Sequence, residues 1–315
     1  MNRCLCCGKP LIDGVSDNNW HPSCIKKFFG TSVIPYIDVS EETIDKLAVE
    51  CTNKGFTVPG VQKKLSLHLT KGTSPRLTLV NYPTGYILKP NTKDYVGLPE
   101  MEYLIMQMAR ISGIKTVPFG LLKIPTTDVV YAYITKRIDR QNKQILAMED
   151  FCQLSNKPTS EKYHGSYERC GKIIKDYSHM KGIDRAEFYC RLVFSFVVGN
   201  SDMHLKNFSL IETQEGSGIY ELSAAYDMLS TNVVLPSDEE EMALALNGKK
   251  KNIHSKDFYA LAESLELPKN AAQKIIKQIV DLEGTYIEMC EQSFLPDDMK
   301  DSLIALIKTR IAVLS

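Results

Sequence analysis

The chain has 315 residues, of which 43% are hydrophobic and 24% are charged. These values are typical of a folded globular protein and unlike those of a disordered or fibrous one. The 38 basic and 38 acidic residues leave no net charge, whereas a protein that depends on contacts with nucleic-acid phosphates is normally basic. No apolar run reaches the roughly 18 residues of a membrane span, and the first residues do not resemble a signal peptide. We therefore expect a cytoplasmic protein that binds neither a membrane nor, directly, a nucleic acid.

The first 24 residues hold four of the nine cysteines, an arrangement that favours a local metal site over a disulfide framework. Two pairs, Cys4 with Cys7 and His21 with Cys24, each have two residues between their members. This gap lets both side chains of a pair reach one ion. Cys6 competes for a place in the first pair. Three cysteines and one histidine predict a closed, structural Zn²⁺ site, and the alternative is a group of unrelated reduced cysteines.

Hydrophobic periodicity predicts a β-rich lobe after this Cys/His head. Helices are expected at 40–54, where Ser40 is the candidate N-cap, and at 99–112. Strands are expected at 64–69, 76–81, 85–88, 117–122 and 129–134.

From about residue 140 the pattern becomes helical. The clearest helix is expected at 184–200, with Asp184 as its cap, because its apolar density indicates burial. A strand and turn at 222–229 and two or three helices within 255–315 follow. The predicted domains are a head at 1–30, a β-rich lobe at 31–137 and a helical lobe at 138–315, with a hinge near 134–139.

A polar loop follows the apolar helix predicted at 184–200. Asp202 and Asn207 are five residues apart in it. Protein kinases use this separation between the aspartate that accepts the substrate hydroxyl proton and the asparagine that binds Mg²⁺. Twenty residues after Asn207, Asp227 stands where a kinase keeps its second metal-binding aspartate. Phosphoryl transfer needs positioning, metal ions and positive charge more than covalent chemistry, and these residue types supply them.

The β-rich lobe offers basic groups for a nucleotide. Lys89 ends a predicted strand, and Glu100 and Glu102 of the following helix are candidates to hold it. The loop at 57–64 has backbone amides and lysines suited to phosphates, although it lacks the Gly-Lys-Ser/Thr ending of a Walker A motif. Each residue also has a plainer interpretation, such as a turn residue for Asp202 or a solvated strand residue for Lys89. Their order across both lobes favours the kinase interpretation.

With these residues the sequence resembles the HipA family of bacterial toxin kinases. The matching stretches are 58–67, 85–90, 136–140, 148–153, 200–209 and 226–230, in family order. The head, with Trp20-His21-Pro22-Ser23-Cys24, is similar to short family members that begin with a small Cys/His motif. The resemblance implies an α+β, two-lobed protein-kinase-like fold and phosphorylation of serine or threonine in a protein, with ATP and Mg²⁺ as cofactors.

By position match, the resemblance makes Asp202 the catalytic base and Asn207 and Asp227 the Mg²⁺ ligands. The implied ATP contacts are Lys89 at the phosphates, Gly60, Val61, Gln62, Lys63 and Lys64 over them, His204, Lys206 and Tyr226 lining the site, and Lys136 and Ile138 at the adenine hinge. Thr57 stands where the family's phosphate loop has a serine that is autophosphorylated. Lys136 stands where some members have an acidic hinge residue.

The resemblance also implies partners. Known targets of the family are aminoacyl-tRNA synthetases, whose inactivation halts translation, and a DNA-binding antitoxin usually neutralises the kinase. Long members have an extra N-terminal subdomain, and this sequence has room only for its 30-residue head at that place. In some systems the subdomain is a separate small protein, so we expect a three-component operon.

Two other classes of function stay open from the sequence. One is a catalytically weak, kinase-like binding module whose zinc head contacts nucleic acid, as zinc knuckles can. The head offers only Trp20, beside Lys26 and Lys27, as a stacking residue, and the presence of every expected catalytic residue argues against this alternative. The other is a small-molecule or lipid kinase, because the same residues phosphorylate any hydroxyl.

Overall fold

The structure is a computed structural model that describes residues 3–11, 19–38, 64–70, 72, 74–78, 85–91, 95–124, 130–141 and 144–315. These residues form two compact units. The first comprises Met1–Tyr103 and Val117–Arg137, and the second comprises Leu104–Thr116 and Ile138–Ser315. The helix expected at 40–54 lies outside the described residues.

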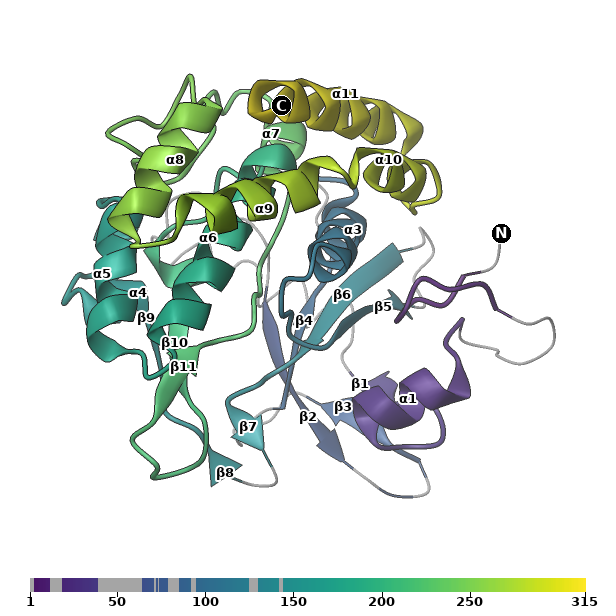
Figure 1. Cartoon of the computed structure of the whole chain (residues 1–315). Coiled ribbons are helices and arrows are strands. Elements are labelled where there is room, and N and C mark those ends of the chain that lie inside the picture. The colour runs from purple at the N-terminus through teal and green to yellow at the C-terminus, as the bar shows by residue number, and fades with distance from the viewer. Residues whose placement is uncertain are drawn as a thin grey trace. The chain divides into compact units, whose positions relative to one another are not determined.

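The first unit contains a six-stranded sheet with the order β1-β3-β2-β4-β6-β5 (Figure 1). Its strands are β1 Tyr36–Asp38, β2 Leu65–Thr70, β3 Arg76–Thr78, β4 Tyr86–Lys89, β5 Phe119–Ile124 and β6 Val130–Lys136. β1 pairs with β3 in parallel, and the other neighbours are antiparallel. All five strands expected in this lobe are confirmed with small shifts of their ends, although residues 79–81 of one lie outside the described part of the chain.

β4 is an inner strand, and its position decides where Lys89 lies. It pairs with β2 on one side and β6 on the other, with Leu88 opposite Ile134 and Lys89 opposite Tyr133. Leu88 and Lys89 are both buried. The short apolar run 86–89 is therefore a strand with neighbours on both sides. It carries the ammonium group of Lys89 into the interior of the unit.

The head joins this sheet through an aromatic cluster. Helix α1, Pro22–Phe29, begins with a proline at a position that favours it. Phe28 and Phe29 of α1 pack against Trp20, with ring centroids 5.4 and 5.5 Å apart, and against Tyr86 of β4 at 5.8 and 5.6 Å. Rings at these separations make favourable contacts beyond the area that they bury. The head is thus part of the first unit's core.

Helix α3, Leu98–Ile111, confirms the helix expected at 99–112. Its residues up to Tyr103 belong to the first unit, and those from Leu104 onward belong to the second. The segment 104–116 belongs to the second unit but is flanked in the sequence by residues of the first, so the chain crosses between the units at both of its ends.

The second unit is mainly helical. Its three-stranded sheet has the order β11-β10-β9, and β7 and β8 form a two-stranded sheet. The strands are β7 Arg140–Gln141, β8 Gln144–Ile145, β9 Met148–Asp150, β10 Ser209–Glu212 and β11 Tyr220–Leu222. The helices are α4 Phe151–Leu154, α5 Tyr167–Tyr177, α6 Lys181–Val197, α7 Thr231–Val234, α8 Ser255–Ser264, α9 Lys269–Val280, α10 Glu283–Glu291 and α11 Asp297–Leu314, with 3-10 turns η1 Thr159–Glu161 and η2 Leu205–Asn207.

Helix α6 is buried along most of its length, as its apolar density predicts. The prediction of Asp184 as its N-cap is wrong, because the helix begins three residues earlier and Met180 precedes it. Acidic residues are favoured both at the N-cap and in the first turn, so the sequence could not separate the two positions. The Asp184 carboxylate accepts hydrogen bonds from Ser178 Oγ at 2.5 Å and from the Leu222 backbone N–H at 2.7 Å. It therefore ties the start of α6 to β11.

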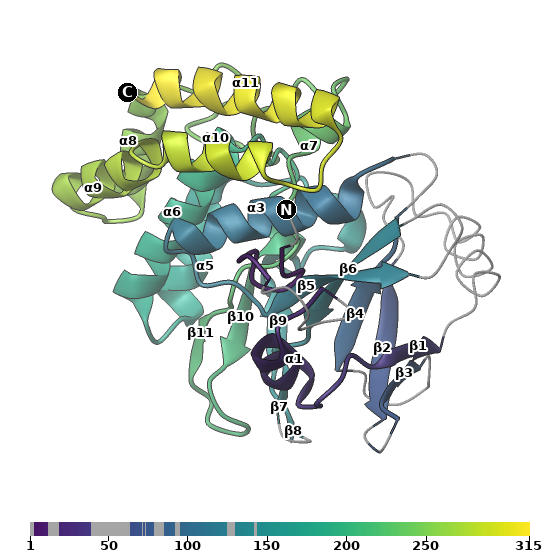
Figure 2. The same cartoon turned by 90° about the vertical axis from the view of Figure 1, so that its right-hand side faces the viewer.

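Residues 255–315 form four helices, one more than the upper expectation. α9 and α11 pack against α6, and α10 packs against α11 (Figures 1 and 2). These helices cover the buried helix that precedes the polar loop, so the loop follows a rigid, well-covered element. No helix of the described residues is both long and apolar enough to cross a membrane.

Candidate active site and candidate metal centre

A buried ion pair lies in the first unit. Nζ of Lys89, at the end of β4, is 2.5 Å from Oε1 of Glu102 in α3, and the two side chains are 4% and 1% exposed. The same ammonium lies 5.4 Å from the ring centroid of Tyr133, within the range of a cation–π contact. Two charges taken this far from water are tolerated only because each compensates the other. Of the two glutamates expected to hold Lys89, the structure selects Glu102.

Glu100 has a different environment from Glu102. Its Oε2 is buried and has no hydrogen-bond partner in the described part of the chain. Burial raises the pKa of the Glu100 carboxyl to about 7, because desolvation disfavours the charged form. Its charge in turn contributes to the raised pKa of Tyr131 in β6, after burial of the tyrosine itself.

In the second unit, the polar loop brings Asp202 and Asn207 into direct contact. Asn207 Nδ2 donates to the backbone carbonyl of Asp202 at 2.7 Å, and the backbone N–H of His204 donates to the same carbonyl at 2.8 Å. Asn207 is buried, whereas the Asp202 side chain is 28% exposed and can be reached from solvent. With Nδ2 used as a donor, the amide oxygen of Asn207 is the atom suited to a hard cation.

Tyr163, which sequence reasoning missed, holds the Asp202 carboxylate. Its hydroxyl donates to Asp202 Oδ1 at 2.5 Å. Burial, followed by the charge of Asp202, raises the pKa of the Tyr163 phenol, so it stays a protonated donor at neutral pH. His204 packs edge-on against the Tyr163 ring at 5.0 Å, and the backbone N–H of Leu205 donates to the Lys162 carbonyl. No local pattern marks Tyr163, because it lies 39 residues before Asp202 in the sequence.

Further contacts fix the ends of the loop. Ser201 donates to the Asp238 carboxylate at 2.7 Å through Oγ, and its backbone N–H donates to Thr231 Oγ1 at 2.7 Å. Lys206 Nζ lies 2.8 Å from Oδ2 of Asp150, the residue that caps α4. The sequence assigned no role to Asp150, although it lies in the matching stretch 148–153, or to Asp238, since each acts on the loop from a distant segment.

Tyr226 and Asp227 follow β11, and Tyr226 contacts the loop. The Tyr226 hydroxyl donates to the Lys206 carbonyl at 3.1 Å and is 2.6 Å from Ser209 Oγ. Asp227 has φ of 59°, in the left-handed region that a residue with a side chain rarely adopts. Strain of this kind gathers at functional sites, where surrounding structure holds it in place.

The remaining predicted nucleotide contacts are only partly described. Five of the predicted positions lie outside the described residues: Gly60, Val61, Gln62, Lys63 and the predicted phosphorylation position Thr57. Lys64 is exposed just before β2. Lys136 ends β6, where its backbone N–H donates to the Pro118 carbonyl, and Ile138 belongs to the second unit.

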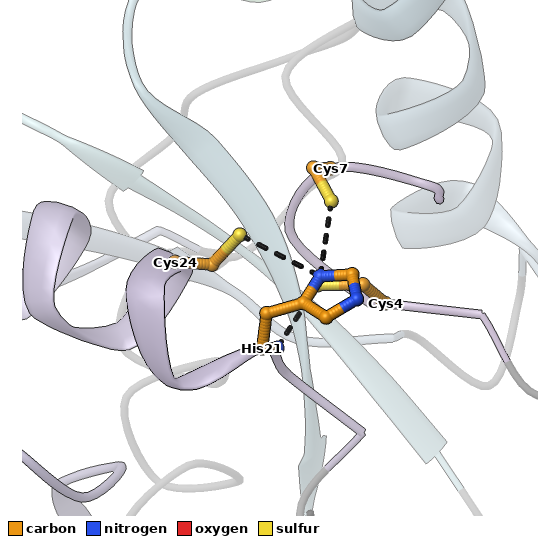
Figure 3. A group of neighbouring side chains, drawn as sticks. All are labelled: Cys4, Cys7, His21 and Cys24. Atoms are coloured by element: carbon orange, nitrogen blue, oxygen red, sulfur yellow. Dashed lines mark hydrogen bonds between the residues drawn. The ribbon is translucent and has the colours of Figure 1, made fainter. Parts of the chain in front are cut away.

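The predicted metal ligands of the head meet in one cluster. One ligand atom from each of Cys4, Cys7, His21 and Cys24 lies within 4.8 Å of all the others. Figure 3 shows the Cys7 and Cys24 sulfurs directed at Nδ1 of His21. The two sulfurs lie 3.4 and 3.9 Å from that nitrogen. Bonds of about 2.0 Å to nitrogen and 2.3 Å to sulfur place tetrahedral ligand atoms at separations of this size. The four residues therefore fit a Zn²⁺ ion.

Neighbouring groups support the same ligand set. His21 Nε2 lies 3.1 Å from the Pro10 carbonyl, which suits a histidine that donates from one nitrogen and binds metal with the other. The backbone N–H of His21 donates to Cys4 Sγ at 3.4 Å. Cys6, the competitor within the sequence, directs its thiol at the Phe119 carbonyl instead. The structure thus separates Cys7 from Cys6, which the spacing alone could not do.

Comparison with known proteins identifies the family. The model of the HipA-like C-terminal domain matches residues 56–284 of the chain. The chain belongs to the HipA-like family. This match includes β4 with Lys89, α3 with Glu102 and the loop with Asp202, so the described residues of the candidate active site lie within the family's domain, and the Cys/His cluster precedes it.

Relatives of this HipA-like chain carry kinase names. It is 34% identical to "Putative kinase Y4dM" of Sinorhizobium fredii over 72% of this chain and 58% of the relative. It is 25% identical to a "Putative kinase" of Haemophilus influenzae over 100% of this chain and 98% of that protein. It is 24% identical to the "Serine/threonine-protein kinase toxin HipA" of Shewanella oneidensis over 68% of this chain and 52% of the toxin. The chain thus spans little more than half of the first and third relatives and nearly all of the second.

Solved structures show the same fold. A chain of the Shewanella oneidensis HipA, HipB and operator DNA complex matches with a TM-score of 0.65 and 21% identity, over 81% of this chain and 63% of that one. The Helicobacter pylori proinflammatory kinase CtkA matches with a TM-score of 0.53 and 15% identity, over 78% of this chain and 90% of that one. The predicted α+β fold, with a β-rich first part and a helical second part, is confirmed.

Glu100 predicts a pH dependence of stability. Its folded-state pKa of about 7 lies above the ordinary value of 4.5. Between these values the folded chain keeps a proton that the unfolded chain loses, so stability falls as pH rises through this window, by up to about 3 kcal/mol. Glu100→Gln should remove most of this loss. Thermal unfolding midpoints of wild type and variant at pH 5 and pH 8 measure the difference.

Glu263→Gln is the control for this prediction, because Glu263 is an exposed residue of α8. It should keep the wild-type decline between pH 5 and pH 8. A Glu100→Gln variant with the same decline as wild type would contradict the raised pKa.

Proposed function

We propose that this HipA-like protein is an ATP-dependent serine/threonine protein kinase that uses Mg²⁺. The observation that carries the proposal is the buried pair of Lys89 and Glu102. Protein kinases hold their phosphate-binding lysine by such a lysine–glutamate pair. An apolar pair of similar volume would pack as well or better, so packing does not explain why two charges are buried here.

The proposed chemistry assigns a task to each described residue. Asp202 accepts or orients the proton of the attacking hydroxyl, and Tyr163 keeps one of its carboxylate oxygens in place. Asn207 and Asp227 would hold Mg²⁺, which neutralises the charge of the phosphoryl group. Lys89 would contact the phosphates of ATP, and the nucleotide roles of Lys64, Lys136, Ile138, His204, Lys206 and Tyr226 are part of the same proposal.

Asp202→Asn tests the central role. Loss of a positioned acid–base group slows a reaction by about 10²–10⁴-fold, and Asp202 is not expected to contribute strongly to ATP binding. The assay incubates the full chain with ATP, Mg²⁺ and a bacterial lysate, and then quantifies new phosphopeptides by mass spectrometry. ATP binding of the same variant is measured by calorimetry.

The control for this assay is Asp301→Asn, because Asp301 is exposed on α11. It should phosphorylate at the wild-type rate. If Asp202→Asn also does so, the assignment of Asp202 is wrong. Phosphate found only on small molecules or lipids would favour the alternative kinase class.

Trp20 is the stacking residue on which the nucleic-acid-binding alternative would depend. Trp20 would have to be exposed to stack with a base, but it is fully buried and its Nε1–H donates to the Leu121 carbonyl at 2.9 Å. Lys26 and Lys27 remain exposed on α1 without an aromatic platform beside them in the described head.

For the biological role we propose the toxin of a toxin–antitoxin system that phosphorylates a translation component such as an aminoacyl-tRNA synthetase. The proposal is supported by the Shewanella oneidensis relative, which is named a toxin, and by the complex that contains HipA, HipB and operator DNA. The proposed partners are a DNA-binding antitoxin and a separate small protein that corresponds to the N-terminal subdomain of long members.

Thr57 is the proposed position of autophosphorylation. A phosphate there adds a charge of about −1.5 to −2, which would repel the phosphates of ATP if the segment before Lys64 covers them as the resemblance implies. The phosphorylated chain should therefore be less active. Phosphopeptide mapping after incubation with ATP locates the modification, and Thr57→Asp should lower the phosphorylation rate. Phosphate only at other positions, or a fully active Thr57→Asp variant, would contradict this role.

We further propose that Cys4, Cys7, His21 and Cys24 bind one structural Zn²⁺. Elemental analysis of the purified chain should give about one zinc per molecule. Cys7→Ser should lose the metal, because its sulfur belongs to the cluster. Cys6→Ser is a closely matched control, since Cys6 is the adjacent residue but directs its thiol at β5. Equal zinc contents in the two variants would contradict the proposed ligand set.

A further inference from the structure

The metal-ligand segments bond directly to β5, one of the two end strands of the first unit's described sheet. The backbone N–H of Leu121 in β5 donates to the carbonyl of Leu5 at 2.8 Å, and its carbonyl accepts from Trp20 Nε1 at 2.9 Å. Leu5 lies between the ligands Cys4 and Cys7, and Trp20 directly precedes the ligand His21. Both ligand pairs are therefore connected to the same residue of β5. Figures 1 and 2 show the N-terminal segment beside this strand.

The contact with β5 is close enough to restrict which residue can stand there. A Cβ atom at Gly120 would lie 2.6 Å from the Trp20 ring and 3.2 Å from the Leu5 carbonyl. Contacts below about 3 Å to a fully buried ring cannot be relieved without moving one of the elements. The ligand segments and β5 thus fit together as closely as parts of one core.

A second connection leads from a metal ligand to the helix that carries Glu102. The hydroxyl of Tyr103 donates to the backbone carbonyl of Cys4 at 3.2 Å, and Tyr103 is only 5% exposed. Tyr103 is the residue after Glu102 in α3. Within this one turn, one side chain contacts the Lys89 ammonium and the next contacts the backbone of a metal ligand.

A third connection runs through aromatic rings to Lys89. The Tyr103 ring packs edge-on against Phe119 of β5, with centroids 5.8 Å apart, and Phe119 stacks on Tyr133 at 6.0 Å. Lys89 Nζ lies over the Tyr133 ring. Both members of the ion pair are therefore reached from the head by chains of direct contacts inside one unit.

We propose that Tyr103 is a positioning residue through which metal bound in the head fixes the Lys89–Glu102 pair and thereby the affinity for ATP. With the ion bound, Cys4 has a fixed place, and its carbonyl holds Tyr103 and the adjoining Glu102. Without the ion, the segments around Cys4–Cys7 and His21–Cys24 lose their common centre, and this turn of α3 gains freedom. The inference rests on the proposed kinase function and on the proposed Zn²⁺ site.

The test measures the affinity of the full chain for a non-hydrolysable ATP analogue with Mg²⁺, by calorimetry. Wild type is compared before and after removal of zinc with a chelator that leaves Mg²⁺ in place. Removal should weaken binding by about fivefold or more, the usual size of a coupling between two sites. A wild-type chain that contains no metal, or whose analogue affinity does not change on zinc removal, would overturn the proposal.

Tyr103→Phe isolates the coupling, because it keeps the ring against Phe119 and removes only the hydroxyl that bonds to Cys4. It should retain its zinc and bind the analogue about three- to tenfold more weakly than wild type, the size of one lost hydrogen bond. Zinc removal should then weaken analogue binding by a clearly smaller factor in this variant than in wild type. If zinc removal weakens analogue binding by the same factor in Tyr103→Phe as in wild type, the proposed role of Tyr103 is wrong. Tyr36→Phe, at an exposed tyrosine of β1, should match wild type in both measurements.

Hydrogen exchange of the amides in α3 gives a readout that needs no nucleotide. Zinc removal should speed exchange at residues 101–105 in wild type and less so in Tyr103→Phe, whose zinc-loaded form should already exchange faster. If zinc-loaded wild type does not bind the analogue, the proposed kinase function is wrong, and the exchange rates alone decide the coupling. Rates at 101–105 that are unchanged by zinc removal would overturn it.

Discussion

The ion pair of Lys89 and Glu102 is the constraint that organises the first unit. Desolvating two charges costs several kcal/mol per ion, and their attraction repays this only when the geometry is good. An inner strand and a packed helix provide that geometry, because neither can shift far without disturbing its neighbours. β4 needs β2 and β6 on its two sides, and α3 needs support near Glu102. The head, the aromatic cluster and the sheet order all contribute to this support.

In the second unit, hydrogen bonds rather than a buried ion pair hold the polar loop in place. A polar loop beside a buried helix must satisfy its own backbone groups, or the burial becomes costly. Asn207 and His204 share the Asp202 carbonyl, and Tyr163 holds its carboxylate. Tyr163 therefore supports the loop from outside the proposed ligand set, whereas Asn207 and His204 both support the loop and belong to that set. Such support is what keeps a catalytic group in one orientation before a substrate arrives.

Local sequence patterns predicted the features that depend on near neighbours in the chain. The alternating strands, the buried α6 and the paired metal ligands fall in this group, as does the place of Asp202 and Asn207 in one polar loop after α6. Tyr163 could not be found this way, because its partner is 39 residues distant and a lone tyrosine has no periodic signature. The prediction of Asp184 as an N-cap was wrong for another reason, because the N-cap and the first turn of a helix favour the same residue type. The choice between Cys6 and Cys7 needed the direction of a side chain, which spacing does not contain.

The hydrogen bonds between the head and Leu121 have a further consequence, for solubility. In the described sheet β5 is the last strand on its side, and an open last strand offers unpaired N–H and C=O groups to strands of other molecules. Leu5 and Trp20 already use both groups of Leu121, so the head occupies bonding groups at the middle of a strand that would otherwise invite self-association. Protecting this edge is a task for the first 24 residues that would remain even in a chain with no catalytic activity.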